Sequence, residues 1–172
     1  MDTVIRRCST RDATTIASLG ARLFVQAYGP THPEPELSHY LARSYSVQVM
    51  AKIIAEDGDI FVIEDSAGTP IGYAHLRATL ELPAGVHGQH AFEIARFYVD
   101  SSWQGRGVGA ALMKYCCAIA KEAGADVIWL QVWSQAPWAI GFYQRMGFAI
   151  VGKKNFYFGE RVDEDHVMSL AL

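Results

Sequence analysis

The fold is decided by residues 92–123, FEIARFYVDSSWQGRGVGAALMKYCCAIAKEA. Residues 93–102 are mostly apolar or β-favouring and predict a strand followed by a short turn. Gly105, Gly107 and Gly109 then remove side chains at the point where a helix must begin. The first turn of a helix has unpaired N–H groups and the positive end of the helix dipole, so this loop predicts a site for a phosphate-bearing ligand.

The rest of the composition is that of an ordinary globular protein. The 172 residues are 51% hydrophobic and 19% charged, which predicts one domain spanning residues 1–172. No apolar run is long enough to span a membrane, and the N-terminus lacks a signal-peptide core, so we expect a cytoplasmic protein. The formal net charge of -3 argues against a nucleic-acid binder and is compatible with a cationic substrate.

The three cysteines, Cys8, Cys116 and Cys117, form neither a disulfide framework nor a zinc-binding spacing. We therefore expect buried or half-buried free thiols and no metal.

Hydrophobic periodicity and turn residues predict helices and strands along the whole chain. The expected helices cover Ser9 to about Ala27, Glu36 to about Ala55 with a break near Ser44–Ser46, Arg106 to about Ala123, and a short segment from Pro137 to Gly147. The expected strands are Thr3–Arg7, Ile60–Glu64, Ile71–Ala78, the strand before the glycine loop, Val127–Val132, Phe148–Gly152, Phe156–Phe158 and Val167–Leu172, with an acidic turn at Asp163–Asp165.

The glycine loop alone leaves two phosphate ligands open. Residues 105–110 also satisfy the dinucleotide pattern G-x-G-x-x-G/A, with Asp126 about 20 residues further on, which would indicate an oxidoreductase. In the dinucleotide fold, however, the glycine turn follows its strand tightly and the acid ends the second strand. Here Asp100–Gln104 intervene and Asp126 precedes its strand. No G-K-[ST] follows the loop, which excludes a P-loop nucleotide triphosphatase.

Two motifs resemble those of the GCN5-related N-acetyltransferase superfamily. The first is Arg96–Asp100 followed by residues 104–109, QGRGVG, which is similar to its acyl-CoA motif Q/R-x-x-G-x-G/A. The second is residues 129–133, WLQVW, followed by residues 139–148, AIGFYQRMGF. The resemblance implies a single α/β (α+β) domain with a mixed, mostly antiparallel sheet of six or seven strands, about four flanking helices, and a splay between the fourth and fifth strands.

The resemblance also implies a site for acetyl-CoA. The expected cofactor-binding residues are Tyr98, Val99, Gln104, Gly105, Arg106, Gly107, Val108, Gly109 and Ala110. Ala136 stands where many relatives have an asparagine that contacts the pantetheine arm, so one side-chain hydrogen bond to the cofactor is missing.

Acetyl transfer to an amine needs an acid for the departing thiolate and a route for the amine proton. Tyr143 resembles the family acid, although a core aromatic at this position is the alternative. Glu93 is the candidate base, against the alternative of a salt-bridged carboxylate. His75 and His90 are further proton acceptors that the sequence leaves open.

The residues 24–45 resemble the N-terminal region of polyamine acetyltransferases. The resemblance therefore implies transfer from acetyl-CoA to a primary amine of a small molecule, polyamine favoured, by direct attack in a ternary complex. Tyr28, His32 and Glu34 are the expected acceptor-binding residues, and the rings of Tyr28, Tyr40 and Tyr45 are candidates for cation–π contact with the amine. Dimers are common in the family, and a homodimer is compatible with the resemblance.

Two other functions stay open. One is an acyl-CoA-binding sensor or interaction module with little activity, and the other is the dinucleotide-dependent oxidoreductase.

Overall fold

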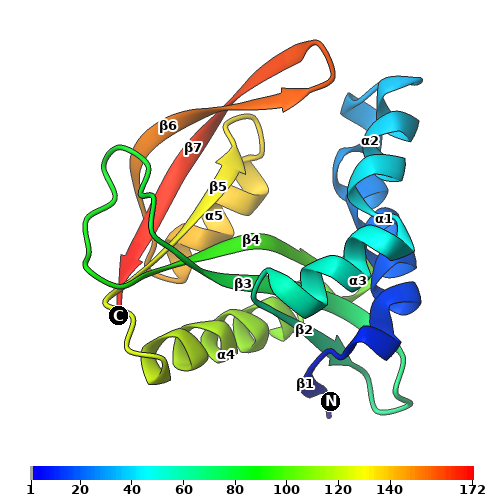
Figure 1. Ribbon diagram of the computed structural model, residues 1–172, viewed down its shortest axis with the longest axis horizontal. Helices are drawn as coiled ribbons and strands as arrows, with labels where there is room; N and C mark the ends of the chain where they lie inside the picture. Colours follow the sequence, from blue (N-terminus) through cyan, green and yellow to red (C-terminus); the bar gives the residue numbers. More distant parts are fainter. Residues whose placement is uncertain (1) are drawn as a thin grey trace. The chain divides into compact units, whose positions relative to one another are not determined.

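The computed structural model describes residues 2–172. Contacts divide the chain into a first unit, residues 2–75 with 96–112, and a second unit, residues 76–95 with 113–172. The elements in chain order are β1 (Val4–Arg7), α1 (Ala13–Tyr28), α2 (Glu36–Ser44), α3 (Val47–Glu56), β2 (Asp59–Glu64), β3 (Pro70–Thr79), β4 (Ala91–Val99), α4 (Val108–Glu122), β5 (Val127–Trp133), α5 (Pro137–Arg145), β6 (Ala149–Phe158) and β7 (Arg161–Ala171) (Figure 1).

The strands form one seven-stranded sheet in the order β1-β2-β3-β4-β5-β7-β6. β4 and β5 are parallel, whereas β5 with β7 and β7 with β6 are antiparallel. The pairing of β4 with β5 stops at Ile94, although β4 continues to Val99. The expected α/β fold, the strand number and the splay between the fourth and fifth strands are therefore confirmed.

In the first unit, α1 buries one face. Ile16, Leu19, Leu23 and Phe24, the four apolar residues at helical spacing, are all at most 5% exposed. The four central residues of β2, 60–63, are also buried, so this strand contributes both of its faces to the core. The expected break between the second and third helices is confirmed, because Ser46 accepts a hydrogen bond from the N–H of Val49 and begins α3.

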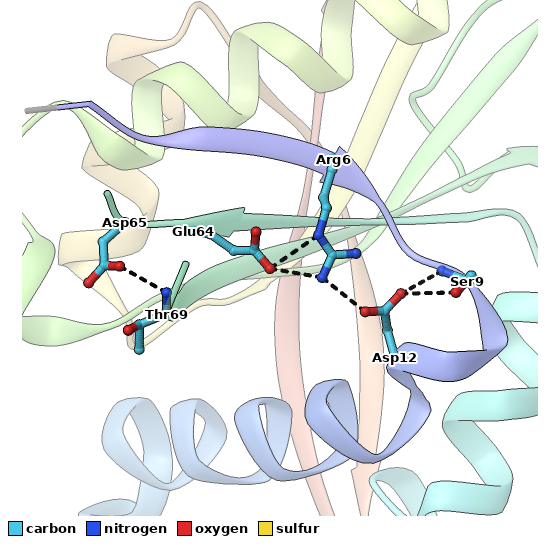
Figure 2. A network of polar contacts seen from close by, with 6 residues as sticks. All are labelled: Arg6, Ser9, Asp12, Glu64, Asp65 and Thr69. Carbon is cyan, nitrogen blue, oxygen red and sulfur yellow. Dashed lines mark hydrogen bonds and ion pairs between the residues drawn. The ribbon is translucent and has the colours of Figure 1, made fainter. Parts of the chain in front are cut away.

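A polar network ties β1 to the start of α1 (Figure 2). The guanidinium of Arg6 donates to Glu64 Oε1 at 2.8 Å and to Asp12 Oδ1 at 2.9 Å. Asp12 Oδ2 in turn accepts the N–H of Ser9 at 2.8 Å, and Ser9 is the N-cap of the short helical turn Thr10–Asp12 that precedes α1. Arg6 thus bridges a carboxylate of β2 and the carboxylate that caps the first helical turn.

The turn between β2 and β3 is stabilised by the side chain of Asp65, which lies in the turn itself. Asp65 Oδ1 accepts the backbone N–H of Ala67 at 2.9 Å and of Thr69 at 2.8 Å, and Figure 2 shows the second of these bonds. Gly68 has a φ of +80°, in the left-handed region that glycine favours. The turn expected at residues 65–70 is therefore present.

In the second unit, β5, β7 and β6 lie side by side (Figure 1). β6 is one strand with an irregular register between Ile150 and Gly152, where two short strands were expected. The predicted acidic turn at Asp163–Asp165 is wrong, because these residues lie inside β7. Asp163 and Asp165 alternate with Glu164, so the two aspartates are buried and the glutamate is exposed. A turn was predicted here because acidic residues are rare in strand interiors.

The cysteines behave as expected. Cys8 and Cys116 are buried free thiols and Cys117 is half-buried. Burial raises the pKa of Cys8 and of Cys116 to about 12 each, so neither is a thiolate at neutral pH.

Candidate active site

The glycine loop forms an open cradle at the N-terminus of α4. The first helical hydrogen bond runs from the N–H of Ala111 to the carbonyl of Gly107 at 2.9 Å, so the N–H groups of Val108, Gly109 and Ala110 precede it. Gly107 has a φ of +81° and Gly105 a φ of +74°, and a Cβ at either would meet nothing within 4 Å. The loop therefore exposes backbone donors to an incoming phosphate, and its residues fit the pyrophosphate of acetyl-CoA.

The helix begins two residues later than the sequence predicted. A residue in the left-handed region cannot lie inside an α-helix, so α4 begins only after Gly107, at Val108. Arg106 lies between the two left-handed glycines, with its guanidinium 5.3 Å from the ring centroid of Trp103.

Asp100 fixes the strand end from which the cradle departs. Its carboxylate accepts the N–H of Ser102 at 3.0 Å and pairs with Arg22 of α1. Burial disfavours the charged carboxylate, but the hydrogen bonds from Arg22 and Ser102 outweigh it and lower the pKa of Asp100 to about 2. Sequence reasoning missed this pair, because nothing in the sequence connects positions 22 and 100.

Gly72 of β3 allows close contact with the two β4 residues that were expected to hold the pantetheine arm. A Cβ at Gly72 would lie 2.7 Å from the carbonyl oxygen of Tyr98 and 3.2 Å from the Cα of Val99. No side chain fits between the backbones at this point. A glycine inside a strand is a known signal of close backbone approach, and the sequence analysis overlooked it.

Of the three expected acceptor-binding residues, Tyr28 contacts Tyr98 and His32 contacts Tyr28. The rings of Tyr28 and Tyr98 are perpendicular, with centroids 6.5 Å apart, and the ring of His32 lies 5.8 Å from that of Tyr28. His32 is only 5% exposed, although it belongs to a loop. Glu34 takes no part in this cluster, because its carboxylate accepts the N–H of Ser38 at 3.2 Å at the start of α2.

One of the three tyrosines expected to contact the amine, Tyr45, already has a cation next to its ring. The guanidinium of Arg96 lies 4.7 Å from the ring centroid of Tyr45 and donates to the carbonyl of Ser44 at 3.0 Å. Tyr45 is only 5% exposed, and burial raises the pKa of its hydroxyl to about 12. The Tyr45 ring thus already contacts the cation of Arg96, and its contact with a substrate amine stays a prediction.

In the second unit, Tyr143 is placed by α5. It is 8% exposed, and its ring lies 5.3 Å from Phe142 and 6.0 Å from Phe148, measured between centroids. Ala136, directly before α5, is fully buried. Tyr143 is thus held rigidly among aromatic rings, a position that suits both a core residue and a well-oriented acid.

Glu93 of β4 forms an ion pair with Arg77 of β3. Arg77 Nε donates to Glu93 Oε2 at 2.8 Å, and the glutamate side chain is 13% exposed. The salt-bridged alternative from the sequence is therefore present in the structure. The role of Glu93 as the base stays a prediction.

The two alternative histidines lie in different environments. His75 is buried, and its Nε2 contacts the backbone carbonyl of Asp57. His90 is exposed, and its backbone N–H donates to Asp126 Oδ1 at 3.1 Å.

Asp126 accepts backbone hydrogen bonds from the loop that precedes β4. Its carboxylate accepts the N–H of Gln89 at 2.8 Å as well as that of His90, and these bonds lower its pKa. It lies before β5, as the sequence indicated, and it closes the loop that precedes β4. Asp126 thus has a structural role in this loop, and its place before β5 differs from that of the acid in the dinucleotide fold.

Within residues 2–172, no group of three or more His, Cys, Asp or Glu side chains is placed to hold a metal ion. A search of the same residues finds no helix with the length and apolarity to cross a membrane.

Comparison with known proteins identifies the family of the chain. The model of the acetyltransferase (GNAT) family matches residues 21–148, which include both motifs. An uncharacterized N-acetyltransferase of Mycobacterium bovis is 27% identical over 158 residues, covering 91% of this chain and 96% of the relative. Aminoglycoside N(6')-acetyltransferase type 1 of Stenotrophomonas maltophilia is 28% identical over 120 residues, covering 70% of this chain and 69% of the relative.

Among solved structures, the PaiA N-acetyltransferase of Thermoplasma acidophilum in complex with coenzyme A has the same fold. Its TM-score is 0.79 at 19% sequence identity, and the match covers 100% of both chains. The family match covers most of the chain and includes the glycine cradle. The chain therefore belongs to the acetyltransferase (GNAT) family and is an acetyl-CoA-dependent N-acetyltransferase.

Proposed function

We propose that this enzyme transfers the acetyl group of acetyl-CoA to a primary amine of a small molecule, with polyamines as the favoured acceptors, by direct attack in a ternary complex. The observation that carries the proposal is the cradle at residues 104–110, with two left-handed glycines and three N–H groups ahead of the first helical bond. Backbone donors of this kind hold pyrophosphate, while Arg106 adds a positive charge.

In the proposed reaction, the amine nitrogen attacks the thioester carbonyl carbon and the carbon–sulfur bond breaks. Glu93, paired with Arg77, takes the proton that the amine loses. Tyr143 gives its phenolic proton to the departing thiolate. Main-chain groups of Tyr98 and Val99 orient the thioester, and Gly72 keeps their backbone in place.

Two observations support an acceptor that carries positive charge. The chain has a formal net charge of -3, and a relative is named for aminoglycosides, which carry several amino groups. The ring of Tyr28 lies next to those of Tyr98 and His32, whereas Glu34 contacts Ser38. We therefore keep Tyr28 and His32 as acceptor-binding residues and give Glu34 a capping role.

Release of free thiol from acetyl-CoA tests the activity directly, across a panel of polyamines, aminoglycosides, amino acids and peptides. We expect turnover with at least one small amine and thermal stabilisation by acetyl-CoA and CoA but not by NAD or NADP. Absence of thiol release with every amine would overturn the proposed reaction.

The acyl-CoA sensor is a second candidate, because the base and the acid both have structural partners. Glu93 is paired with Arg77, and Tyr143 is packed between Phe142 and Phe148. A sensor would bind acetyl-CoA and release no thiol. The free thiols Cys8 and Cys116 suit the reducing cytoplasm that we propose as its location. The homodimer stays a prediction, which sedimentation of the purified protein tests.

A further inference from the structure

Residues 100–104 connect β4 to Gly105, the first left-handed residue of the cradle. Three of them, Ser101–Trp103, form a short helical turn, whose last N–H donates to the carbonyl of Asp100 at 2.9 Å. Gln104 is extended and follows this turn directly. The conformation of the turn therefore sets the direction in which the chain enters the cradle.

The carboxylate of Asp100 holds this turn and is itself held by α1. Its Oδ1 accepts the N–H of Ser102 at 3.0 Å and the hydroxyl of the same residue at 2.7 Å. Its Oδ2 pairs with the guanidinium of Arg22. The Asp100 side chain is only 13% exposed, and a carboxylate with so little access to water depends on its partners for its charge and its orientation. Arg22 therefore helps to orient the group that shapes the turn.

A second side chain of α1 contacts the same turn. Gln26 Oε1 accepts the N–H of Ser101 at 3.3 Å. Arg22 and Gln26 are four residues apart, so they lie on the same side of the helix, one turn from each other. The helix itself is packed on the core through Leu19 and Leu23, which are 5% and 2% exposed. It is thus a well-packed support that contacts the turn at two points.

The sheet fixes the start of the turn and leaves the rest to side chains. The N–H of Asp100 donates to the carbonyl of Ile71 in β3 at 2.8 Å, so the first residue is held by the sheet. The next two N–H groups, those of Ser101 and Ser102, donate to the side chains of Gln26 and Asp100. Beyond its first residue, the turn therefore depends on contacts that α1 supplies or orients.

We propose that Arg22 and Gln26 are positioning residues for acetyl-CoA, because they hold the turn that aims the N–H groups of the cradle at the pyrophosphate. This inference rests on the proposed cradle at residues 104–110 and adds two residues of the first helix to it. Hydrogen bonds weaken steeply as their angle departs from linearity. A small rotation of the turn therefore lowers the affinity for a pyrophosphate that several N–H groups must meet together. Neither residue is catalytic in this role, since each acts through the turn.

Calorimetric titration of the full chain with CoA tests the proposal without relying on turnover. Arg22→Gln removes a charged partner of Asp100 and should weaken CoA binding by about fivefold to tenfold. Gln26→Met removes one neutral acceptor and should weaken it by about twofold to threefold. Both side chains are exposed, so both variants should fold.

Arg6→Gln is the matched control, because Arg6 holds the carboxylate of another short helical turn in the same unit. Arg6 Nη2 donates to Asp12 Oδ1 at 2.9 Å, and Asp12 Oδ2 accepts the N–H of Ser9 (Figure 2). The side chains of Arg6 and Arg22 are similarly exposed, at 40% and 48%. Arg6 also pairs with Glu64, so Arg6→Gln should lower the urea midpoint at least as much as Arg22→Gln. It should nevertheless change CoA affinity by less than about twofold.

A double-mutant cycle distinguishes positioning from direct contact with phosphate. If Arg22 acts through Asp100, Arg22→Gln should change CoA affinity by less than about twofold in an Asp100→Asn background. The full loss in both backgrounds would overturn the proposal, because Arg22 would then act on the cofactor directly. Equal losses of CoA affinity in Arg22→Gln and Arg6→Gln would also overturn it, because general destabilisation would then be the cause.

Failure of the proposed cradle would look different. In that case Gly107→Glu would bind CoA with the affinity of the wild type, and so would Arg22→Gln. Loss of CoA binding in Gly107→Glu together with an unchanged affinity in Arg22→Gln would refute the positioning role alone.

Discussion

The substitution Gly107→Glu isolates the cradle from the rest of the fold. Gly107 has a φ of +81° and an open surrounding, so the added side chain meets no atom within 4 Å. The stability cost is therefore the left-handed backbone alone, about 1–2 kcal/mol. Gly68, in the turn between β2 and β3, has a φ of +80° and an equally open surrounding. Gly68→Glu should cost the same stability and is the matched control.

The two variants should differ in acetyl-CoA binding. A carboxylate about 4 Å from a phosphate charge is repelled by about 1 kcal/mol in water and by about 4 kcal/mol at the effective dielectric of a protein surface. The affinity of Gly107→Glu for acetyl-CoA should thus fall by about fivefold to a thousandfold, and the loss should shrink as salt is added. Calorimetry at two ionic strengths measures both effects. Equal acetyl-CoA affinity of Gly107→Glu and Gly68→Glu would refute the assignment of the loop.

Three further predictions concern the residues around the cradle and the proposed acid. Tyr143→Phe should lower kcat by about a hundredfold, because the phenolic proton donor is lost. The KM for acetyl-CoA and the Tm should stay nearly unchanged, because the ring contacts remain. An unchanged kcat in the thiol assay would make Tyr143 a core residue. Gly72→Ala should raise the KM for acetyl-CoA and lower stability by about 1–3 kcal/mol, as urea unfolding measures, because its Cβ would lie 2.7 Å from the carbonyl oxygen of Tyr98. Asp100 has a folded pKa of about 2, below its unfolded value near 4, so its contribution is complete above about pH 4 and is lost as the pH falls towards 2. The stability difference between wild type and Asp100→Asn should be about 1–2 kcal/mol at pH 6 and should vanish near pH 2, whereas a constant difference would contradict the role of the Arg22 pair.

The cradle was predictable because its physics is local. Glycine is needed wherever the backbone is left-handed, and Gly105 and Gly107 both are. The same holds for Ser9 and Asp65, whose side chains bond to backbone groups at most four residues away. Residue type and short spacing determine such features, so the sequence alone indicates them.

Partner choice between distant residues was not predictable. The pair of Arg22 with Asp100 joins positions 78 residues apart. The sequence was equally consistent with a paired and a free Glu93, and the structure shows that Arg77 pairs with it. His32 shows the same limit, because its burial follows from packing against Phe24 and Tyr28, which the sequence does not indicate. These contacts depend on tertiary register, which hydrophobic periodicity does not determine.

Charge distribution decides where a cationic acceptor would bind. The tyrosines of the first unit looked suitable in the sequence, but Arg96 contacts Tyr45 there, and a second cation in that cluster would meet like-charge repulsion. The aspartates of β7 looked like a solvated turn, but Asp165 is buried with one oxygen unsatisfied. Strand alternation explains this difference, because it places Asp163 and Asp165 on the buried face of β7 and Glu164 on the exposed face. The charges that decide the environment of these two regions, Arg96 beside Tyr45 and the carboxylate of Asp165 in β7, therefore depend on tertiary packing that the sequence pattern did not indicate.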